Sequence, residues 1–580
     1  MNAVDHKAKT VSFAIVGSGG AGAITAGSIL LEAAGKSGWY GLLTRSVGPQ
    51  IRGGEAAALV RLSTEPVACM SKAFDILVAI DWKNADRFIG NMPVAKGGVV
   101  ICDPAAGDPP KAVRDADCTI VQCPIGEMAK AIPGGRENMI SVGLVTKLIG
   151  LPLNSVMKTV ASKLNSKGAQ AIETGRACIE AGMQATHAFD PPKPLAPAKD
   201  QNSKRWLITG NEAVGLGALR GGVSFAAAYP ITPATEVLEY LAPALASVGG
   251  ALVQAEDELA SINMIIGASF GGRAAITATS GPGLALMMES LGLAAASETP
   301  IVVVDVMRVG PSTGIATKSE QSDLNIAVYG LHGDAEHVVV APLSVSDCVF
   351  TAQWAVHIAE TLQTPVVVLS DQSIGQARVL IDIPTDVTFL TQRKPFVATN
   401  ESYLRYGVTA DGISPMALPG QSGGQYTADG LTHTERGAPS SAKSDQHEQM
   451  VKRATKIGGF DFGDYWGVSE GDAASDRVIL TWGSMTGAAR EALGLLTERG
   501  IPARLVSLRQ ISPFPTDALQ AALSGAKRVL IVEQSFSGQF YRHVRAHIDL
   551  PYDCRQLNRE GPYEIGPDEI ATQIRDWTDQ

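Results

Sequence analysis

Three acids in a row, Glu256, Asp257 and Glu258, precede a segment of mostly small or apolar residues that runs to Gly267. Carboxylates are favoured in the first turn of a helix, and Glu256 and Asp257 are explained by a solvated first turn. Glu258 stands at the apolar boundary, where burying a carboxylate is costly. It is therefore a candidate site residue, with a plain first-turn acid as the alternative.

A second polar group follows the apolar strand predicted for Ile301–Val306. Arg308 comes just past the carboxyl end of this strand, which is where open α/β sheets bind their ligands. A guanidinium in that place suits a carboxylate, and a structural ion pair is the alternative. Thr317 and Asp323 follow in the same polar stretch.

Two turn-forming stretches can aim polar groups. One is the run Tyr229-Pro230-Ile231-Thr232-Pro233, whose prolines hold the residues between them extended and can point the Thr232 hydroxyl at a fixed place. The other is Ser280-Gly281-Pro282-Gly283, where Ser280 is a plausible helix cap and the glycines permit a sharp turn. A plain loop is the alternative for both.

A glycine-rich turn lies near the start of the chain, Gly17-Ser18-Gly19-Gly20-Ala21-Gly22, directly after a predicted strand. Free amides at the start of the following helix favour a phosphate. A dinucleotide site also needs an acid about 20 residues further on to bind the ribose. No acid occurs there. Arg45 could accept the 2′-phosphate of NADP, so an NADP site stays open. A tight turn without a ligand is the alternative.

These residues must be positioned by alternating strands and helices. The βαβ order of strand Ala274–Thr279, helix Gly283–Ala296 and strand Ile301–Val306 predicts a parallel sheet buried on both faces. Similar alternation begins at strand Val11–Val16 and again at strand Val478–Trp482. The predicted fold class is α/β with several domains.

Composition excludes several classes of protein. The 580 residues are too many for one core, and a net charge of −10 argues against a nucleic-acid binder. We see no signal peptide and no run of the roughly 18 apolar residues that span a membrane, so a cytoplasmic protein is expected. The seven cysteines form no CxxC pair. We therefore expect no metal or iron–sulfur cluster on this chain.

Together these stretches resemble the 2-oxoacid:ferredoxin oxidoreductases. The resemblance implies a Rossmann-like γ domain over 1–189, a linker over 190–204 and a pyrimidine-binding thiamine diphosphate domain over 205–386. A long linker or loop over 387–475 and a transketolase C-terminal-like domain over 476–580 complete the chain.

The resemblance also implies roles for single residues. Glu258 matches the acid that contacts the cofactor's aminopyrimidine ring and promotes deprotonation of the thiazolium carbon. Three residues match those that hold the 2-oxoacid: Thr232, Arg308 and Thr317. Further cofactor contacts are implied for Tyr229, Pro230, Ile231, Ser280 and Gly281. Candidates for coenzyme A phosphates are Gly17, Gly19, Gly20, Gly22 and Arg52.

The implied reaction is the oxidative decarboxylation of a 2-oxoacid with coenzyme A, and the reverse reaction, which fixes CO₂. The γ domain precedes the part that resembles the α subunit. This order resembles that of the enzymes that act on 2-oxoglutarate and yield succinyl-CoA. No Gly-Asp-Gly occurs in the sequence. The resemblance therefore implies that Mg²⁺ and a four-iron four-sulfur cluster lie on a partner β subunit, which shares the thiamine diphosphate in a dimer of αβ heterodimers and reduces ferredoxin.

Three alternatives stay open at this stage. The same reaction class can act on pyruvate or on a branched-chain or aryl 2-oxoacid. The glycine-rich turn allows an NAD(P)-dependent dehydrogenase, which saturable NADPH binding would reveal. A non-catalytic scaffold subunit is the third alternative, and the substitution Glu258→Ala tests it.

Overall fold

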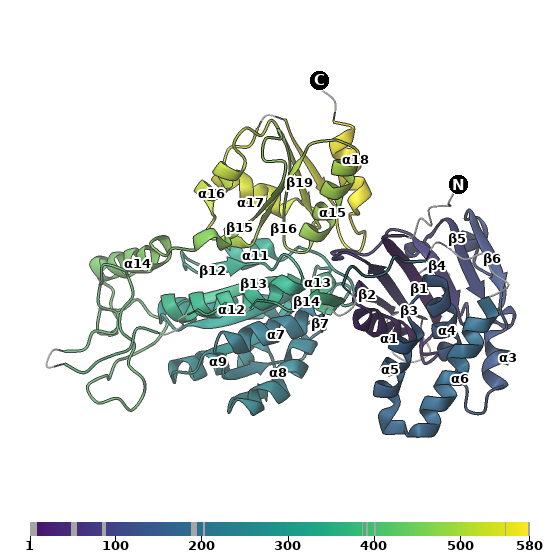
Figure 1. Ribbon diagram of the computed structural model, residues 1–580. Helices are drawn as coiled ribbons and strands as arrows, with labels where there is room; N and C mark the ends of the chain where they lie inside the picture. Colours follow the sequence, from purple (N-terminus) through teal and green to yellow (C-terminus); the bar gives the residue numbers. More distant parts are fainter. Residues whose placement is uncertain are drawn as a thin grey trace. The chain divides into compact units, whose positions relative to one another are not determined.

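The computed structural model describes residues 8–47, 55–83, 89–186, 194–200, 204–385, 387–389, 393–399, 402–551 and 553–577. The chain divides into two compact units. One unit comprises Met1–Ile208 and Ala377–Pro384, and the other comprises Thr209–Gln376 and Thr385–Gln580. Figure 1 colours the first mainly purple and blue and the second teal to yellow. None of the helices in these described segments has the length and apolar character needed to cross a bilayer.

The first unit is built on one mixed sheet of eight strands, in the order β6-β5-β4-β1-β3-β2-β14-β7. Its strands are β1 (Thr10–Ser18), β2 (Tyr40–Val47), β3 (Glu55–Ser63), β4 (Phe74–Ala79), β5 (Val94–Cys102), β6 (Cys118–Gln122), β7 (Arg205–Thr209) and β14 (Arg378–Asp382). Its helices are α1 (Ala23–Lys36), α2 (Lys111–Arg114), α3 (Ile125–Lys130), α4 (Glu137–Ile149), α5 (Leu153–Leu164) and α6 (Ala169–Ala185). The predicted strand at Val11–Val16 and the helix after it are confirmed.

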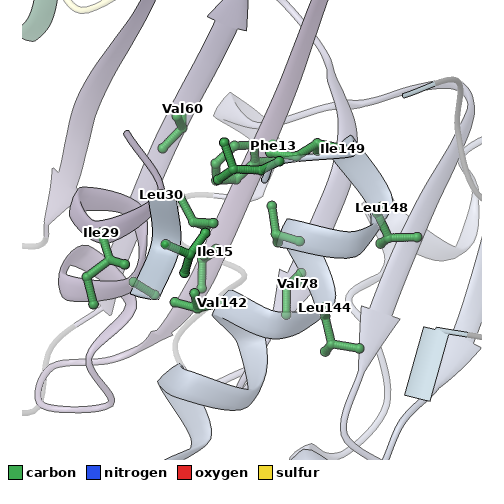
Figure 2. Packing of buried hydrophobic residues seen from close by; sticks show 14 of the residues in the cluster. Phe13, Ile15, Ile29, Leu30, Val60, Val78, Val142, Leu144, Leu148 and Ile149 are labelled. Atoms are coloured by element: carbon green, nitrogen blue, oxygen red, sulfur yellow. The ribbon is translucent and has the colours of Figure 1, made fainter. Parts of the chain in front are cut away.

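The core of this unit lies between the sheet and its helices. Figure 2 shows Phe13 and Ile15 of β1 among apolar side chains of α1 and α4, including Leu30 and Val142. All four side chains are fully buried. Burial of this kind is the main favourable term in folding, and it holds α1 and the turn before it in place.

The second unit contains a seven-stranded sheet in the order β18-β12-β13-β11-β10-β8-β9. Its strands are β8 (Phe225–Ala228), β9 (Ala251–Gln254), β10 (Ala275–Thr279), β11 (Ile301–Met307), β12 (Val338–Val340), β13 (Pro365–Asp371) and β18 (Gln510–Ser512). Helices of this part are α7 (Gly210–Arg220), α8 (Thr235–Ser247), α9 (Glu258–Phe270), α10 (Gly281–Ala296), α11 (Leu324–Tyr329), α12 (Val345–Leu362) and α13 (Gln372–Gln376). Strands β10 and β11 pair in parallel and are buried along their whole length, which confirms the predicted βαβ unit.

A five-stranded sheet follows in the same unit, in the order β15-β17-β16-β19-β20. Its strands are β15 (Gly467–Gly471), β16 (Arg477–Trp482), β17 (Arg504–Leu508), β19 (Arg528–Glu533) and β20 (Asp553–Asn558). Its helices are α15 (Met485–Glu498), α16 (Thr516–Ala522), α17 (Gln539–His547) and α18 (Pro567–Arg575). Because β18 pairs with β12 and one apolar cluster joins both sheets, the middle and last parts of the chain fold as one body.

The structure differs from the predicted boundaries in two respects. Strands β7 and β14 belong to the first unit, although the sequence placed both in the middle domain. The stretch 387–475, expected to be a loop, contains α14 (Lys443–Gly458) and β15. The buried face of α14 is largely polar, with Gln449, Lys452 and Lys456, so it gave no apolar periodicity to recognise.

A buried ion cluster joins helix α14 to the middle domain, which is the part of the chain predicted at 205–386. Lys452 Nζ lies 2.5 Å and Lys456 Nζ 3.1 Å from the two carboxyl oxygens of Glu298, and all three side chains are almost completely buried. Burial works to raise the pKa of Glu298, but the charges of Lys456, Lys452 and Arg405 outweigh it and lower that pKa to about 2. Glu298 is thus the carboxylate that balances these cations.

Substitution Glu298→Gln is expected to lower the free energy of unfolding by about 3–5 kcal/mol, because it leaves buried cations without a counter-ion. The contribution of a carboxylate with a lowered pKa is present above about pH 4.5 and is lost as the pH falls toward 2. Urea denaturation measures the difference. The exposed acid Glu289 on α10 provides the control Glu289→Gln, and an equal loss in both variants would contradict the assignment.

Candidate active site

The three acids have different surroundings, although they are adjacent in the chain. Asp257 caps α9, because its Oδ1 accepts a hydrogen bond of 2.7 Å from the Ala260 amide. Glu256 and Asp257 are exposed, as predicted for a solvated helix start, whereas the Glu258 side chain is only 8% exposed. Glu258, which the sequence places at the apolar boundary, is therefore mostly buried, unlike its two acidic neighbours.

The Glu258 side chain rests against the turn that opens α10. A Cβ built on Gly283 would lie 2.8 Å from Glu258 Oε1 and 2.0 Å from Thr279 Oγ1, so only glycine fits there. Within the part of the chain that the structure describes, the Glu258 carboxyl has no hydrogen-bond or ion-pair partner. The side chain as a whole is 8% exposed, and its carboxyl oxygens are not among the fully buried atoms without a partner, so they are accessible from outside the chain. This carboxyl therefore fits a polar group supplied from outside the chain, such as the ring of an aminopyrimidine.

Arg308 lies beside the loop that carries Thr232. It follows β11 directly, is 8% exposed and donates a hydrogen bond of 2.7 Å from Nη1 to the Thr232 carbonyl oxygen. Its Nε has no partner among the described residues. Burial lowers the pKa of Arg308, and the negative charge of Asp323 opposes that effect. The structure therefore brings Arg308 and Thr232 together, and the contact uses the Thr232 main chain.

The loop after Arg308 folds back on itself. The Val309 amide donates to the Lys318 carbonyl at 3.0 Å, which places Thr317 on the returning arm of the loop. The Glu320 carboxylate accepts from the Gly310 amide at 3.1 Å and from the Gly561 amide at 3.2 Å. These bonds hold the loop at the carboxyl end of β11.

The expected role of Ser280 as a cap is corrected by the structure. Ser280 precedes α10, but its buried hydroxyl makes no capping bond and has no partner among the described residues. A Cβ on the neighbouring Gly281 would lie 2.6 Å from Asp323 Oδ2. The two glycines of this turn thus admit one carboxyl each, Glu258 at Gly283 and Asp323 at Gly281.

A buried pair of aspartates was not among the predicted site residues. Burial and the nearby Asp323 raise the pKa of Asp305 well above its ordinary value. Burial also raises the pKa of Asp323, to about 6. The signal in the sequence was Asp305 itself, the one acid inside the apolar run Ile301–Met307.

The glycine-rich turn, Gly17 to Gly22, lies in the first unit. Gly20 and Gly22 have positive φ angles of 105° and 84°, which favour glycine. The Ser18 amide and hydroxyl both donate to Asp81 Oδ2 at 2.9 Å. Gly17 and Gly19 lie on either side of Ser18 in the chain. This part of the turn therefore lies beside the Asp81 carboxylate. The coenzyme A candidate Arg52 lies outside the described residues.

Comparison with known proteins gives matches along the whole chain. Family models described as "Pyruvate ferredoxin/flavodoxin oxidoreductase", "Pyruvate flavodoxin/ferredoxin oxidoreductase, thiamine diP-bdg" and "Pyruvate:ferredoxin oxidoreductase core domain II" match residues 12–185, 216–453 and 475–570. The 2-oxoglutarate synthase subunit KorA of Methanothermobacter marburgensis is 35% identical over 380 residues, which cover 64% of this chain and 99% of that protein. The chain belongs to the 2-oxoacid:ferredoxin oxidoreductase family.

Two further members of this oxidoreductase family resemble the chain over most of its length. The 2-oxoacid:ferredoxin oxidoreductase subunit alpha of a Sulfolobus species is 28% identical over 91% of each chain. The solved structure of 2-oxoglutarate:ferredoxin oxidoreductase from Magnetococcus marinus is 33% identical, with a TM-score of 0.91, and covers 98% of this chain and 100% of that one. These matches confirm the predicted family and the predicted multi-domain α/β fold, including a thiamine diphosphate domain around Glu258.

In this oxidoreductase, the substitution Gly283→Ala is expected to lower turnover about 100-fold in the complex with its partner chains. The added methyl group collides with Thr279 Oγ1 and displaces the Glu258 carboxyl, and a misplacement of about 1 Å within a thiamine diphosphate domain can cost that factor. Steady-state rates of the purified complex measure it. Gly292→Ala, in the same helix with no atom nearer than 3.9 Å, is the matched control. Equal rates for both variants would contradict the close fit at Gly283.

Proposed function

We propose that the chain is the catalytic α subunit of a 2-oxoglutarate:ferredoxin oxidoreductase. In this proposal the enzyme converts 2-oxoglutarate and coenzyme A to succinyl-CoA and CO₂ with reduction of ferredoxin, and it can run in reverse. The observation that carries the reaction class is the nearly buried Glu258 carboxyl without a partner, set against Gly283 in a thiamine diphosphate domain. Thiamine diphosphate supplies a nucleophilic carbon that attacks a 2-oxo group.

Each site residue then has a definite task. Glu258 hydrogen-bonds a ring nitrogen of the aminopyrimidine from a side chain that is mostly buried. Arg308 pairs with the substrate carboxylate through the donors that Thr232 does not use, since its Nε is unpartnered. Thr232 and Thr317 border the same carboxylate. Further contacts to the cofactor are assigned to Tyr229, Pro230, Ile231, Ser280 and Gly281.

The choice of 2-oxoglutarate rests on the relatives. KorA proteins of Methanothermobacter thermautotrophicus and Methanocaldococcus jannaschii, both named as subunits of 2-oxoglutarate synthase, are 36% and 37% identical, and the chain covers 98% of each. The Magnetococcus marinus enzyme was solved with 2-oxoglutarate, coenzyme A and succinyl-CoA bound. Pyruvate and the branched-chain and aryl 2-oxoacids are the competing substrates.

The remaining parts are assigned to partner chains. The sequence holds no Gly-Asp-Gly for the diphosphate and Mg²⁺ and no cysteine set for an iron–sulfur cluster. We assign both to a β subunit, in a dimer of αβ heterodimers that delivers electrons to ferredoxin. We assign the coenzyme A phosphates to the first unit, at Gly17, Gly19, Gly20, Gly22 and Arg52.

The test is co-expression with the β subunit, purification and measurement of dye reduction that depends on both a 2-oxoacid and coenzyme A. The proposal expects the highest kcat/KM for 2-oxoglutarate and no activity from the α chain alone. A higher kcat/KM for pyruvate, 2-oxoisovalerate or phenylpyruvate would contradict the substrate assignment. NADPH-dependent turnover by the α chain alone would contradict the reaction class.

A further inference from the structure

The loop that follows Arg308, residues 309–323, is attached to the last domain, the part of the chain that carries the five-stranded sheet. Its tip, residues 311–315, is exposed. The chain reverses at Gly314, which has a φ of 52° and where a Cβ would lie 1.5 Å from the Val309 carbonyl oxygen. An exposed turn has few packing contacts of its own, so the place of the loop depends on the bonds at its base.

Gln321 lies at the centre of this attachment. Its side chain is fully buried, its amide donates to the Gln534 carbonyl oxygen at 2.7 Å, and its Oε1 accepts from the Gln534 amide at 2.9 Å. Its Nε2 also donates to the Trp482 carbonyl oxygen at 3.0 Å. Trp482 is the last residue of β16 and Gln534 directly follows β19, so the carboxyl end of the five-stranded sheet binds the loop.

Glu320 forms a second attachment, to the segment that follows β20. Its carboxylate accepts from the Gly310 amide at 3.1 Å and from the Gly561 amide at 3.2 Å, and so bridges the outgoing arm of the loop to the last domain. A Cβ on Gly561 would lie 2.2 Å from the Ser319 carbonyl oxygen and 2.7 Å from Val309 Cγ2. Gly561 therefore packs with its backbone directly on the loop.

Gln539, in the first turn of α17, forms a third attachment. Its Nε2 donates to the Ser322 carbonyl oxygen at 2.7 Å, and its Oε1 accepts from the Asn325 amide at 2.8 Å. Both bonds run from the side-chain amide to main-chain groups where the loop passes into α11. Gln539 has no assigned task in the reaction, so this attachment can be removed without a change in the site itself.

The two arms of the loop are bonded to each other. The Val309 amide donates to the Lys318 carbonyl oxygen at 3.0 Å, and the Ile315 amide donates to the Val309 carbonyl oxygen at 3.0 Å. Arg308 and Thr317 directly precede Val309 and Lys318 in the chain. A shift of the returning arm is therefore passed on to both residues.

We propose that the last domain positions the substrate-binding residues of the middle domain by holding this loop. Gln321, Glu320 and Gln539 are the positioning residues, and none of them is assigned a contact with substrate or cofactor. The inference rests on the proposed function, which assigns Arg308 and Thr317 to the 2-oxoacid. Groups that bind a ligand must be held within about 0.5 Å of the productive place, so a displaced loop weakens binding of the 2-oxoacid.

The test uses the complete αβ complex with Gln539→Met, which keeps the length of the side chain and removes both of its bonds to the loop. KM for the 2-oxoacid is expected to rise about 2-fold to 30-fold, the usual range for a residue that acts on a site without touching its ligand. The value of kcat should be nearly unchanged. Gln520→Met, at an exposed position of α16 in the same domain, is the matched control and should leave KM unaltered.

Hydrogen exchange separates positioning from a general loss of stability. In the complex without substrate, peptides from residues 309–323 should exchange faster in Gln539→Met, whereas peptides from β16 should exchange as before. Unchanged exchange in the loop would overturn the inference. A rise in exchange that is as large in β16 as in the loop would overturn it as well, since that result means general destabilisation.

A double substitution tests whether the effect passes through Arg308. Residues that act through one another are not additive, so Gln539→Met should raise KM clearly less in an Arg308→Gln complex than in the unsubstituted one. An equal rise in both complexes would overturn the inference. If Arg308→Gln leaves KM unchanged while Gln539→Met still speeds exchange in the loop, the attachment is supported and the substrate role in the proposed function is wrong.

Discussion

Substitution Glu258→Gln is expected to lower turnover of the αβ complex by a factor of about 10² to 10⁴, the usual contribution of a side chain that holds or moves a proton. The amide has nearly the same shape and can fill the place beside Gly283, but it cannot take up or release a proton as a carboxyl group can. The loss should appear mainly in kcat. Rates with saturating 2-oxoacid and coenzyme A measure it.

Two controls separate this loss from a general disturbance. Glu256→Gln changes an exposed acid two residues away and should leave the rate unaltered. The affinity for thiamine diphosphate, measured by tryptophan quenching, should fall in Glu258→Gln, because a hydrogen bond to the ring is weakened. Unchanged turnover in Glu258→Gln would make the chain a scaffold, the alternative that the sequence left open.

Substitution Arg308→Gln is expected to lower kcat/KM by about 30-fold to 5,000-fold, which corresponds to about 2–5 kcal/mol for the loss of one partner of a buried charge pair. The guanidinium is 8% exposed, so water replaces little of the lost attraction. The effect should lie mostly in KM, because the role proposed for Arg308 is to bind the substrate carboxylate, away from the reacting carbon. Initial rates over a wide range of 2-oxoacid concentration separate the two constants.

The variant Arg308→Lys sharpens this prediction. It keeps the positive charge but loses the planar donor set that can reach both the Thr232 carbonyl and a carboxylate. An intermediate KM is expected. The exposed Arg436→Gln in the same unit is the control. If Arg308→Gln raises KM no more than Arg436→Gln does, the carboxylate binds elsewhere.

Much of the fold could be predicted because its strands are short apolar runs between turn residues. The strand at Ile301–Val306, the helix before it and their parallel partner were all found in this way. Glu258 could be singled out because a charge at the head of an apolar segment has few purely structural explanations. The resemblance supplied the family and the candidate roles of Arg308 and Thr317.

Other features depend on contacts between segments far apart in the chain. Strand β14 pairs antiparallel with β2 across more than 300 residues, which no local pattern reports. Helix α14 is recognisable only once Glu298 is seen opposite its lysines. The buried Asp323 carboxyl reaches Gly281 and the end of β11 only because the loop after Arg308 folds back. Such features follow from tertiary packing, and local propensity does not reveal them.

The most direct measurement is a structure of the assembled αβ complex with thiamine diphosphate bound. A Glu258 carboxyl oxygen is predicted to lie at hydrogen-bond distance, about 2.6–3.2 Å, from a ring nitrogen of the aminopyrimidine. A Glu258 side chain that instead points into bulk water, or that forms an ion pair with the partner subunit away from the cofactor, would contradict the account.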